Sequence, residues 1–445
     1  MRFTAFAFLT PEAARLPVAL LMASAGAASA DPAANEHAKG FLERDVALGD
    51  WGEARSALEG DGVAFGLHYT HEYLGVVSGG LGRGGEYNGL LELDVDLNLE
   101  KAIGWKGASL HAGGFYGVGE SISARDVGDD ANVSNINMRN TARLFEVYWD
   151  QQFGDVFSIR FGMLADDSQF YDTAGASFDS RGGTLFVNSA FGAMPLMSFN
   201  VPEPIWPVAA PGACLTVTPT KAFTLRAAIY DGLPIPADDE DRRNPHGLDW
   251  RLNADDGALV MIEAALAVND GPAGDGVSTP AGLRGIYKIG GFYHTATFTH
   301  WADGRPVRGD GGGYFSVCQL VWRENDRDNQ GLSFFTRAGA APRDRNILDF
   351  TLETGLHYRG LLPGRDDDAV GIGVAIEHYS RDFSESERRS GNAGRDHETV
   401  IEFAYRAQIA PWLALQPDLQ IVMHPAGHHS TDNAIVVGLR MAMEF

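Results

Sequence analysis

The sequence predicts an all-β fold: a transmembrane antiparallel β-barrel of about 16 strands, with a short N-terminal helix and an inward-folded constriction loop. Segments of strand length, each with one apolar and one polar face, recur from residue 63 to the end of the chain. No run of about 18 apolar residues, the length of a transmembrane helix, follows the N-terminal region. The last strand ends on Phe445, and we expect it to pair with the first strand, because lipid offers no water to an unpaired N–H or C=O group.

The first 30 residues have the pattern of a secretory signal. Arg2 and Arg15 precede a short apolar run at residues 16–28, and the run ends in an A-x-A cleavage site at residues 28–30. We therefore expect residues 1–30 to be removed from the mature protein. A membrane anchor is the alternative, although the apolar run is short for a bilayer span.

A separate N-terminal segment, residues 31–62, is expected at the periplasmic end of the barrel. In it Trp51, Arg55 and Leu58 recur at helical spacing, and Gly60 is expected to end the turn. These residues predict a short amphipathic helix, which is too small to plug a barrel. Transport through the barrel domain, residues 63–445, is therefore expected to be passive.

Composition narrows the class of protein further. The formal net charge is −24, and the first 30 residues carry two Arg and one Glu, so their removal leaves −25. Such an acidic chain is not expected to bind nucleic acid. The 54 Gly, 25 Phe and 13 Tyr residues suit a barrel, in which half of the strand residues face water, better than a packed α/β enzyme.

Residues 91–99 form the clearest candidate strand. Leucine and valine side chains fall on one face, whereas Glu92, Asp94 and Asp96 fall on the other. A water-filled barrel routinely shows this pattern and a soluble protein rarely does. The final strand alone could also be the edge of a soluble sandwich, but the same alternation recurs along the chain. The other candidate strands are residues 63–73, 108–116, 143–151, 156–163, 213–219, 223–230, 258–268, 286–299, 314–322, 332–338, 348–358, 369–379, 398–408, 413–424 and 434–445.

The chain has two cysteines, few for an exported protein. By alternation Cys214 points to the wet face of its strand and Cys318 points to the opposite face. No disulfide is expected between them.

Connections of two kinds separate the candidate strands. Tight ones, such as residues 218–222 and 410–412, are interpreted as periplasmic turns. The acidic run at residues 238–241 could bind divalent ions together with lipopolysaccharide, although a solvated loop is the favoured interpretation. Four long polar connections are interpreted as extracellular loops: residues 123–140, 233–256, 301–313 and 380–397.

The longest irregular piece runs from Ala165 to Pro211 and contains several aromatic residues and prolines. A loop of this length is usually functional or disordered, and its composition argues against disorder. The lumen of a large barrel is wide enough for water, so selectivity requires a segment that folds inward. This piece is the predicted constriction loop.

From Trp51 to Phe445 the chain resembles the carbohydrate-selective porins of Gram-negative outer membranes, often called the OprB type. The resemblance implies a barrel of about sixteen strands in the outer membrane, with a constriction at which sugars meet aromatic and charged side chains. It also implies passive uptake of sugars such as glucose. Seven landmarks carry it in order: W-G-x-x-R-x-x-L (51–58), G-W-K-G (104–107), F-E-V-Y-W-D-Q-Q (145–152), R-F-G-M-L-A-D-D-S-Q-F (160–170), W-P-V-A-A-P-G (206–212), G-L-x-Y-R-G-L-L-P-G-R-D-x-D (355–368) and L-Q-P-D-L-Q-I-V-M-H-P-A-G (415–427).

Residues that could meet a sugar follow from the same alternation. Hydroxyl groups bind carboxylates, amides and guanidinium groups, and the apolar face of a pyranose packs on an aromatic ring. The alternative for each is that it only keeps the wall wet, or, for Trp206, that it packs the loop on the wall. The candidates are the lumen-facing Glu92, Asp94, Glu146, Tyr148, Arg160 and Arg226, and the loop residues Arg181, Asn200 and Trp206.

Neither catalysis nor a metal or cofactor is expected. His424, His428 and His429 lie near Ser430 and Asp432, but no G-x-S-x-G nucleophile elbow occurs and no spaced third metal ligand is evident.

The expected partners are small sugars, outer-membrane lipid and lipopolysaccharide, and the barrel-assembly machinery through the strand that ends at Phe445. A general non-selective porin and a non-conducting sugar-binding protein are the alternative functions, and the sequence does not decide between a monomer and a trimer.

Overall fold

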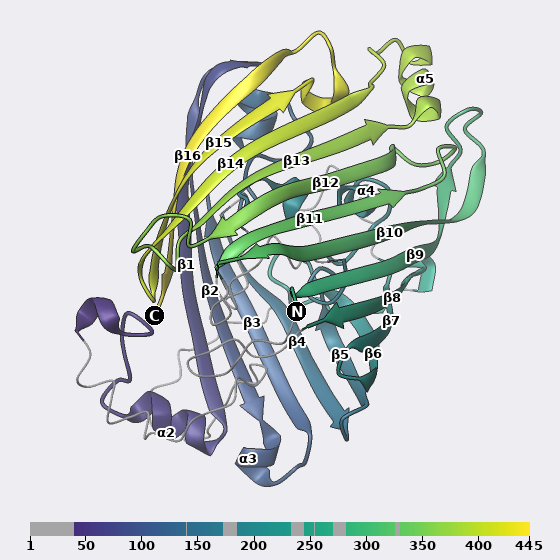
Figure 1. The fold of residues 1–445 in the computed structure, drawn as a ribbon. Coiled ribbons are helices and arrows are strands. Elements are labelled where there is room, and N and C mark those ends of the chain that lie inside the picture. Colours follow the sequence, from purple (N-terminus) through teal and green to yellow (C-terminus); the bar gives the residue numbers. More distant parts are fainter. Residues whose placement is uncertain are drawn as a thin grey trace, which may run out of the picture.

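Sixteen antiparallel strands form a closed barrel in the computed structural model, which describes residues 40–138, 140–171, 185–232, 244–252, 254–269, 282–324 and 330–445. Each strand pairs with its neighbour in the sequence, and β16 returns to pair with β1 (Figure 1). The strands are β1 (Val63–Gly80), β2 (Gly85–Asn98), β3 (Ala108–Val118), β4 (Thr141–Phe153), β5 (Phe157–Leu164), β6 (Ala210–Thr220), β7 (Phe223–Asp231), β8 (Ala258–Val268), β9 (Gly285–Thr299), β10 (Pro306–Arg323), β11 (Gly331–Ala340), β12 (Leu348–Arg359), β13 (Ala369–Tyr379), β14 (His397–Ala410), β15 (Leu413–Met423) and β16 (Asp432–Glu444). The predicted fold class is confirmed.

Short helices lie in the connections and at the N-terminal end. In the described part of the chain, no helix is long and apolar enough to cross a membrane. The helices are η1 (Phe41–Glu43), α2 (Ala54–Asp61), α3 (Leu99–Ile103), η2 (Ser123–Val127), η3 (Ser189–Phe191), α4 (Pro195–Ser198), η4 (Ala254–Asp256), α5 (Arg381–Arg389) and η5 (Pro425–Gly427).

The predicted alternation of faces is confirmed in β1 and β2. Leu91 and Leu93 point outward and are exposed, and Leu93 pairs with the outward Leu67. Asp94, one residue later, points into the lumen and pairs with Gly66. Because side chains alternate along every strand, the outer wall of the barrel is apolar, while the inner wall carries polar residues and also apolar residues, such as Phe335, that pack on segments inside the barrel.

The last strand closes the barrel as predicted. Leu439 pairs with Tyr73 on the outer face, and Arg440 pairs with Glu72 on the inner face. The N–H of Phe445 donates a hydrogen bond of 2.9 Å to the carbonyl of Leu67, so the pairing continues to the end of the chain. Closure removes the unpaired edge that an open sheet would present to lipid.

Helix α2 confirms the predicted N-terminal helix and lies at the same end of the barrel as the C-terminus, called the terminal end below (Figure 1). The Arg55 guanidinium donates hydrogen bonds to the backbone carbonyls of Phe445 (3.0 Å) and Phe65 (2.9 Å). The helix ends at Gly62 rather than at Gly60. Gly62 adopts a φ of 105°, which glycine tolerates, and its N–H caps the last turn.

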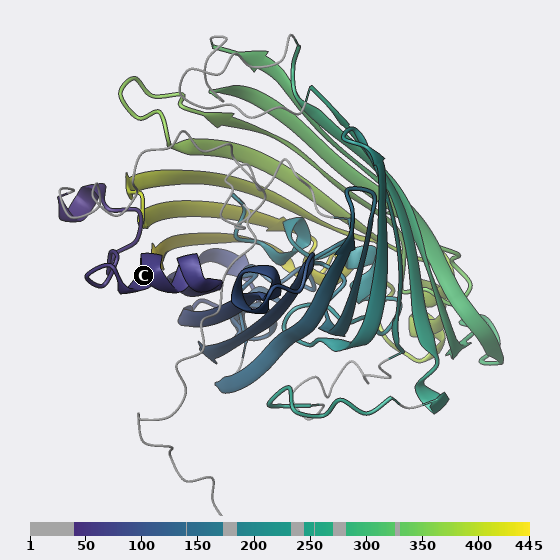
Figure 2. The same ribbon diagram turned by 90° about the horizontal axis from the view of Figure 1, so that it is seen from below.

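Two connections from the opposite end, called the loop end, fold into the barrel, where they lie inside the ring of strands (Figure 2). The longer inward loop joins β5 to β6, where the constriction loop was predicted; residues 165–171 and 185–209 of it are described. The shorter joins β3 to β4: residues 123–140, predicted as a long polar extracellular loop, fold into the lumen, and this inward path was not predicted. Val127 and Val133 of this loop are fully buried, because they pack in one core with Phe186 of the longer loop and Phe335 of the wall.

Two smaller predictions were also wrong. Residues 301–313 are not a long loop: β9 and β10 are joined by a short turn, and β10 begins at Pro306. Cys318 faces the lumen, since it pairs with Ile286, which shares the inward parity of Lys288. Cys214 also faces inward, and both thiols are free and buried, as expected for a chain without a disulfide between them.

Four parts of the predictions lie outside the described residues. They are the signal at residues 1–30, the beginning of the 31–62 segment, Arg181, and the acidic run at residues 238–241.

Carboxylates of the inner wall hold the inward loops by accepting their backbone N–H groups. Glu402 of β14 accepts the N–H groups of Val187 (2.5 Å) and Asn188 (3.0 Å). Glu398, on the same strand, accepts those of Asp130 (3.1 Å) and Ala131 (2.8 Å). A buried backbone amide without a partner is costly, and these side chains supply the missing acceptors.

Arg337 of β11 supplies donors in the same way. Its side chain is fully buried and pairs with Glu353 at 2.9 Å. It also donates to the backbone carbonyls of Tyr171 (3.2 Å), Ala190 (3.0 Å) and Ala193 of the longer loop. One guanidinium group therefore fixes three points of that loop, which its five N–H donors allow.

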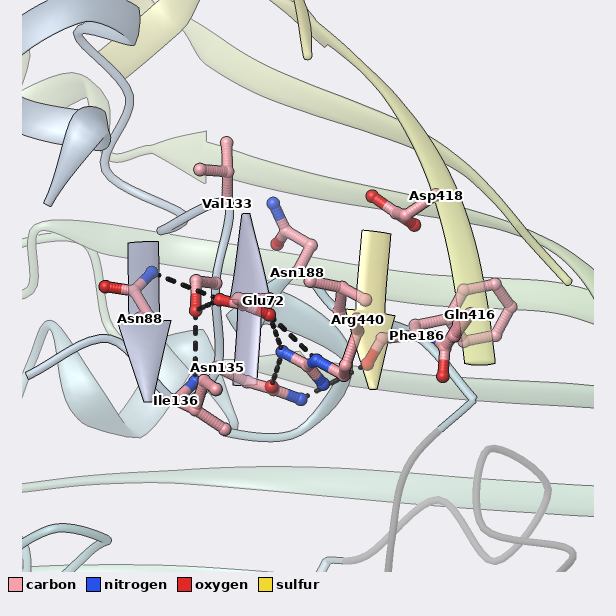
Figure 3. A network of polar contacts seen from close by, with 12 residues as sticks. Glu72, Asn88, Val133, Asn135, Ile136, Phe186, Asn188, Gln416, Asp418 and Arg440 are labelled. Atoms are coloured by element: carbon pink, nitrogen blue, oxygen red, sulfur yellow. Dashed lines mark hydrogen bonds and ion pairs between the residues drawn. The ribbon is translucent and has the colours of Figure 1, made fainter. Parts of the chain in front are cut away.

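A buried ion pair across the closing strands anchors the shorter inward loop (Figure 3). Arg440 of β16 contacts the Glu72 carboxylate of β1 at 2.6 Å, and the Glu72 side chain has no exposed surface. Arg440 also donates to the side-chain oxygen of Asn135 at 2.7 Å, and Asn88 donates to Glu72 at 3.1 Å. Ser134 donates a further hydrogen bond to Glu72. Barrel closure and loop placement thus share one network.

Leu93→Arg tests the outward assignment of β2. Leu93 is 49% exposed on the outer wall, and an arginine facing lipid near the middle of a bilayer costs about 2–4 kcal/mol. We expect weaker assembly, measured as the fraction of heat-modifiable folded barrel in membranes. Leu93→Met is the matched control. Equal folded fractions of Leu93→Arg and parent would contradict the assignment.

Arg440→Met tests the closing network. The substitution leaves the buried Glu72 carboxylate without its cation, and breaking a buried pair costs about 3–5 kcal/mol. We expect a lower free energy of unfolding in a denaturant titration, and faster protease cleavage between β3 and β4. The double variant Glu72→Gln/Arg440→Met removes the unpaired charge and should recover part of the loss. A single variant as stable as the parent would exclude the network as an anchor.

Candidate functional site

A cavity of about 890 Å³ lies inside the barrel, between the inward loops and the inner wall formed by β1, β2 and β13–β16. Its lining includes Ile347 and Glu377, toward the loop end, and Trp412 and Glu444, toward the terminal end. The space therefore follows the barrel wall from one end toward the other. It is the candidate path for a solute.

Four of the nine predicted site residues line this cavity: Glu92, Asp94, Asn200 and Trp206. Glu92 and Asp94 project from the inner face of β2. Glu92 pairs in register with His68, which also lines the cavity. Asp94 lies 3.7 Å from Nε2 of His111. The alternation in this strand thus places two carboxylates where a passing hydroxyl group can reach them.

Trp206 has two roles that the sequence presented as alternatives. It borders the cavity, and its ring lies 5.9 Å from the Phe115 ring of the wall, centroid to centroid. Its backbone N–H donates to the Asp167 carboxylate at 3.3 Å. Trp206 therefore packs the longer loop on the wall while part of it stays at the cavity.

Asn200 lines the cavity but its amide group is engaged with the backbone. The Asn200 nitrogen donates to the carbonyl of Leu348 at 2.7 Å. The Asn200 oxygen accepts the N–H groups of Ile347 (2.8 Å) and Leu348 (3.0 Å). These three bonds fix the longer loop to the start of β12, so the contribution of Asn200 to the site is mainly positional.

Glu146, Tyr148 and Arg160 lie on the inner wall at β4 and β5, away from the cavity lining. Glu146 is buried and accepts the N–H of Ala165 at 2.8 Å, which holds the first turn of the longer loop. The Arg160 guanidinium lies 4.0 Å from the Tyr148 ring centroid and pairs with Asp150 at 3.0 Å. Arg160, Tyr148 and Asp150 thus form a polar cluster on the inner wall beside the longer loop.

Arg226 also points into the lumen beneath the longer loop. It lies 3.4 Å from the Glu263 carboxylate, which accepts the N–H of Tyr171 (2.8 Å) and the hydroxyl of Tyr314 (2.9 Å). Together these contacts hold the longer loop at Tyr171. Arg181, the ninth predicted residue, lies outside the described residues.

Sequence reasoning missed much of the lining. Several of the missed polar residues lie on the inner faces of strands, where alternation alone does not tell which residues border the cavity. Others belong to the loop between β3 and β4, which was assigned to the outside. The missed polar residues include His68, Thr70, Asn132, Asn135, Asn137, Arg406, Gln408 and Gln416.

Three carboxyl groups of the longer loop interact with one another, and two of them, Asp167 and Glu203, line the cavity. The Asp166 and Glu203 carboxyl groups interact directly. Burial raises the pKa of Glu203 to about 8, and burial together with the nearby Glu203 carboxylate raises the pKa of Asp166. Burial also raises the pKa of Asp167 to about 7. Ser198 donates to Glu203 at 2.6 Å, and the Tyr171 hydroxyl donates to Asp166 at 2.8 Å. This cluster can change its charge near neutral pH.

Two of the histidines considered above, His424 and His429, lie close to His397. The ring centroids of His397, His424 and His429 lie between 4.1 and 6.1 Å apart, and Asp396 contacts His397 and His429. Nevertheless, in the part of the chain that the structure describes, no group of three or more His, Cys, Asp or Glu residues is arranged to hold a metal ion.

Comparison with known proteins agrees with this architecture. The family model described as carbohydrate-selective porin, OprB family, matches residues 82–445. The chain is similar to Porin B of Pseudomonas aeruginosa, with 23% identity over 442 residues, 89% of this chain and 91% of that protein. It is also similar to the putative porin QuiX of Acinetobacter baylyi, with 24% identity over 91% of this chain and 94% of that protein.

Among solved structures, the fold resembles the high-pH structure of Pseudomonas putida OprB. The TM-score is 0.81 and the identity is 24%, over 92% of this chain and all of that one. The family match covers far more than half of the chain. This chain therefore belongs to the OprB family of carbohydrate-selective porins, which are channels of the Gram-negative outer membrane.

Proposed function

We propose that this protein lets monosaccharides and small sugars such as glucose diffuse passively across the outer membrane, through the cavity between the inward loops and the inner wall. The observation that carries the proposal is the cavity itself, which two inward loops confine to one side of the lumen. The match to the carbohydrate-selective porin family supports the sugar class. A channel of this kind performs no bond chemistry, so no catalytic role is assigned to any residue.

We assign sugar contact to Glu92, Asp94 and Trp206. All three line the cavity. Carboxylates accept hydrogen bonds from sugar hydroxyl groups, and an aromatic ring packs on the apolar face of a pyranose. Arg406 and Gln408, also in the lining, add groups that can donate hydrogen bonds. Conduction requires contacts that are several and weak, because a sugar that binds too tightly would not leave.

We place the terminal end in the periplasm and the loop end outside the cell. The hydrogen bond from Arg55 of α2 to Phe445 and the backbone hydrogen bonds near it hold both ends of the described chain at the same end of the barrel. This orientation leaves Phe445 and the outward face of β16 available to the barrel-assembly machinery, and the loop end available to lipopolysaccharide.

Solute entry into liposomes that carry the purified protein tests the proposal. Glucose should enter faster than a disaccharide, and faster than an amino acid or a salt of similar size. Entry that depends on size alone would reduce the protein to a general porin. No entry of any solute would instead favour a non-conducting sugar-binding protein.

Trp206 provides the matched variants for this assay. Loss of an aromatic contact costs about 1 kcal/mol, or about a fivefold change, so Trp206→Ala should lower the preference for glucose over the amino acid by about that factor. Trp206→Phe retains an aromatic face and should retain most of the preference. If both variants behave like the parent, Trp206 only packs the loop.

The carboxyl groups of the longer loop predict a pH dependence. Glu203 and Asp167, with pKa values of about 8 and about 7, are mainly neutral at pH 6 and ionised at pH 9. Because both pKa values are raised by folding, the stability that neutral carboxyl groups give the loop is present at low pH and is lost as the pH rises through these values. Rising pH also adds negative charge to the cavity, which favours cations.

We therefore expect the cation preference, measured from the zero-current potential of planar bilayers in a salt gradient, to increase between pH 6 and pH 9. Glu203→Gln should flatten this change. Asp303→Asn, at a solvent-exposed turn, is the control and should leave it intact. The same pH dependence in Glu203→Gln and the parent would show that the charge arises elsewhere.

A further inference from the structure

The connection between β7 and β8 contains a segment, residues 244–252, that extends the barrel wall. Strand β5 has only 8 residues, and its register with β4 begins at Val147. The earlier part of β4 pairs with the 244–252 segment instead. The N–H of Leu144 donates to the carbonyl of His246 at 3.1 Å, and the Thr141 hydroxyl donates to the carbonyl of Pro245 at 3.0 Å.

Gly247 permits this close approach. It has a φ of +69°, and a Cβ atom built on it would lie 1.6 Å from the carbonyl oxygen of Leu144. Any other residue would push the segment away from β4, since that contact is with backbone rather than with a movable side chain. The attachment of the segment to β4 therefore depends on glycine at position 247.

The segment satisfies its own polar groups. The Arg251 guanidinium forms two hydrogen bonds with the Asp249 carboxylate, at 2.8 and 2.5 Å. Asn244 exchanges hydrogen bonds with the backbone of Asp249. The indole N–H of Trp250 donates to the carbonyl of Gly247 at 3.0 Å. The side-chain charges of Asp249 and Arg251 thus form an ion pair within the segment, although both side chains stay exposed.

In contrast, the apolar side chains of the segment are uncovered. Leu248, Trp250 and Leu252 are 73%, 47% and 75% exposed, and they alternate with the ion pair of Asp249 and Arg251. Three large apolar residues at alternate positions are more than the scattered exposure that a surface loop normally shows. The described part of the chain leaves them exposed, so contact with an apolar environment such as lipid would stabilise them.

The position of the segment identifies that environment. It bonds to β4 at Ala142, whose carbonyl lies 3.0 Å from the His246 ring nitrogen. Ala142 pairs with Tyr116 on the outer wall, and Tyr116 is 51% exposed. Outward tyrosines such as Tyr73 and Tyr116 near the loop end are typical of the belt at which a barrel meets the membrane–water boundary. The segment therefore continues the lipid-facing wall at the depth of this belt.

We propose that residues 244–252 form a membrane-interface anchor, in which Leu248, Trp250 and Leu252 insert into the lipid at the loop end of the barrel while Asp249 and Arg251 stay in the headgroup region. Amphipathic segments with Trp and Leu on one face bind at this boundary through their apolar area. The anchor holds residues 244–252 against the outside of the barrel, apart from the solute path.

Site-directed spin labelling tests this anchor. Single cysteines replace Leu248, Asp249, Arg251 or Leu252 in the full chain, in a Cys214→Ala/Cys318→Ala background, and the labelled protein is placed in phosphatidylcholine vesicles. We expect labels at 248 and 252 to be several-fold more accessible to oxygen relative to a water-soluble nickel complex than labels at 249 and 251. Leu93→Cys, on the lipid-facing wall, is the positive control.

Two other outcomes would overturn the proposal. High accessibility to the nickel complex at all four positions would place the segment in water. Low accessibility to both reagents at 248 and 252 would place them against protein, as in contact with a second copy of this chain. In a second measurement, Gly247→Val should detach the segment and raise nickel accessibility at residue 252 several-fold, while the folded barrel fraction is checked by heat-modifiable migration. Unchanged accessibility in that folded variant would also contradict the proposal.

Discussion

Every backbone N–H and C=O group that leaves water must find a partner inside the protein, and the rest of this structure depends on that constraint. Pairing of β1 with β16 meets it for the barrel wall. The inward loops face the same requirement without strand partners. Side chains of the wall replace those partners: Glu398 and Glu402 accept loop N–H groups, and Arg337 donates to loop carbonyls.

This arrangement explains how far the sequence predicted the fold. Alternation of apolar and polar residues identified about sixteen strands and the outward faces of most of them, because side chains that face lipid must be apolar. The N-terminal helix was predicted from Trp51, Arg55 and Leu58, but Trp51 lies before its first residue and has a φ of 51°, so only Arg55 and Leu58 are helical. The end of the helix at Gly62 depended on a left-handed cap that spacing did not reveal. Cys318 was assigned to the wrong face because β10 offers weak alternation, with glycines before Tyr314 and Phe315.

The loops and the site were harder to predict, for a physical reason. The loop between β3 and β4 is polar in composition, and its inward position depends on partners far away in the sequence, such as Glu398 and Arg440. Likewise, alternation shows that Glu92 and Glu146 both face the lumen. It does not show that Glu92 borders the cavity while Glu146 accepts a loop amide. Only the path of the loop separates a carboxylate that lines the cavity from one that holds the loop.

The wall side chains that hold the inward loops also determine how this channel can select solutes. Both inward loops are held by charged or amide side chains at several points, as Arg337 and Asn200 show, and the two loops pair with each other through Asn135 and Val187. A constriction with so many fixed points is formed before a solute arrives, so little ordering cost is added when a solute enters. Trp206 and Asp94 line this fixed path, and in the proposed function their placement along it gives the selectivity. A fixed path with weak contacts allows a neutral sugar to move from one group to the next, whereas a binding loop that closed on the sugar would retain it.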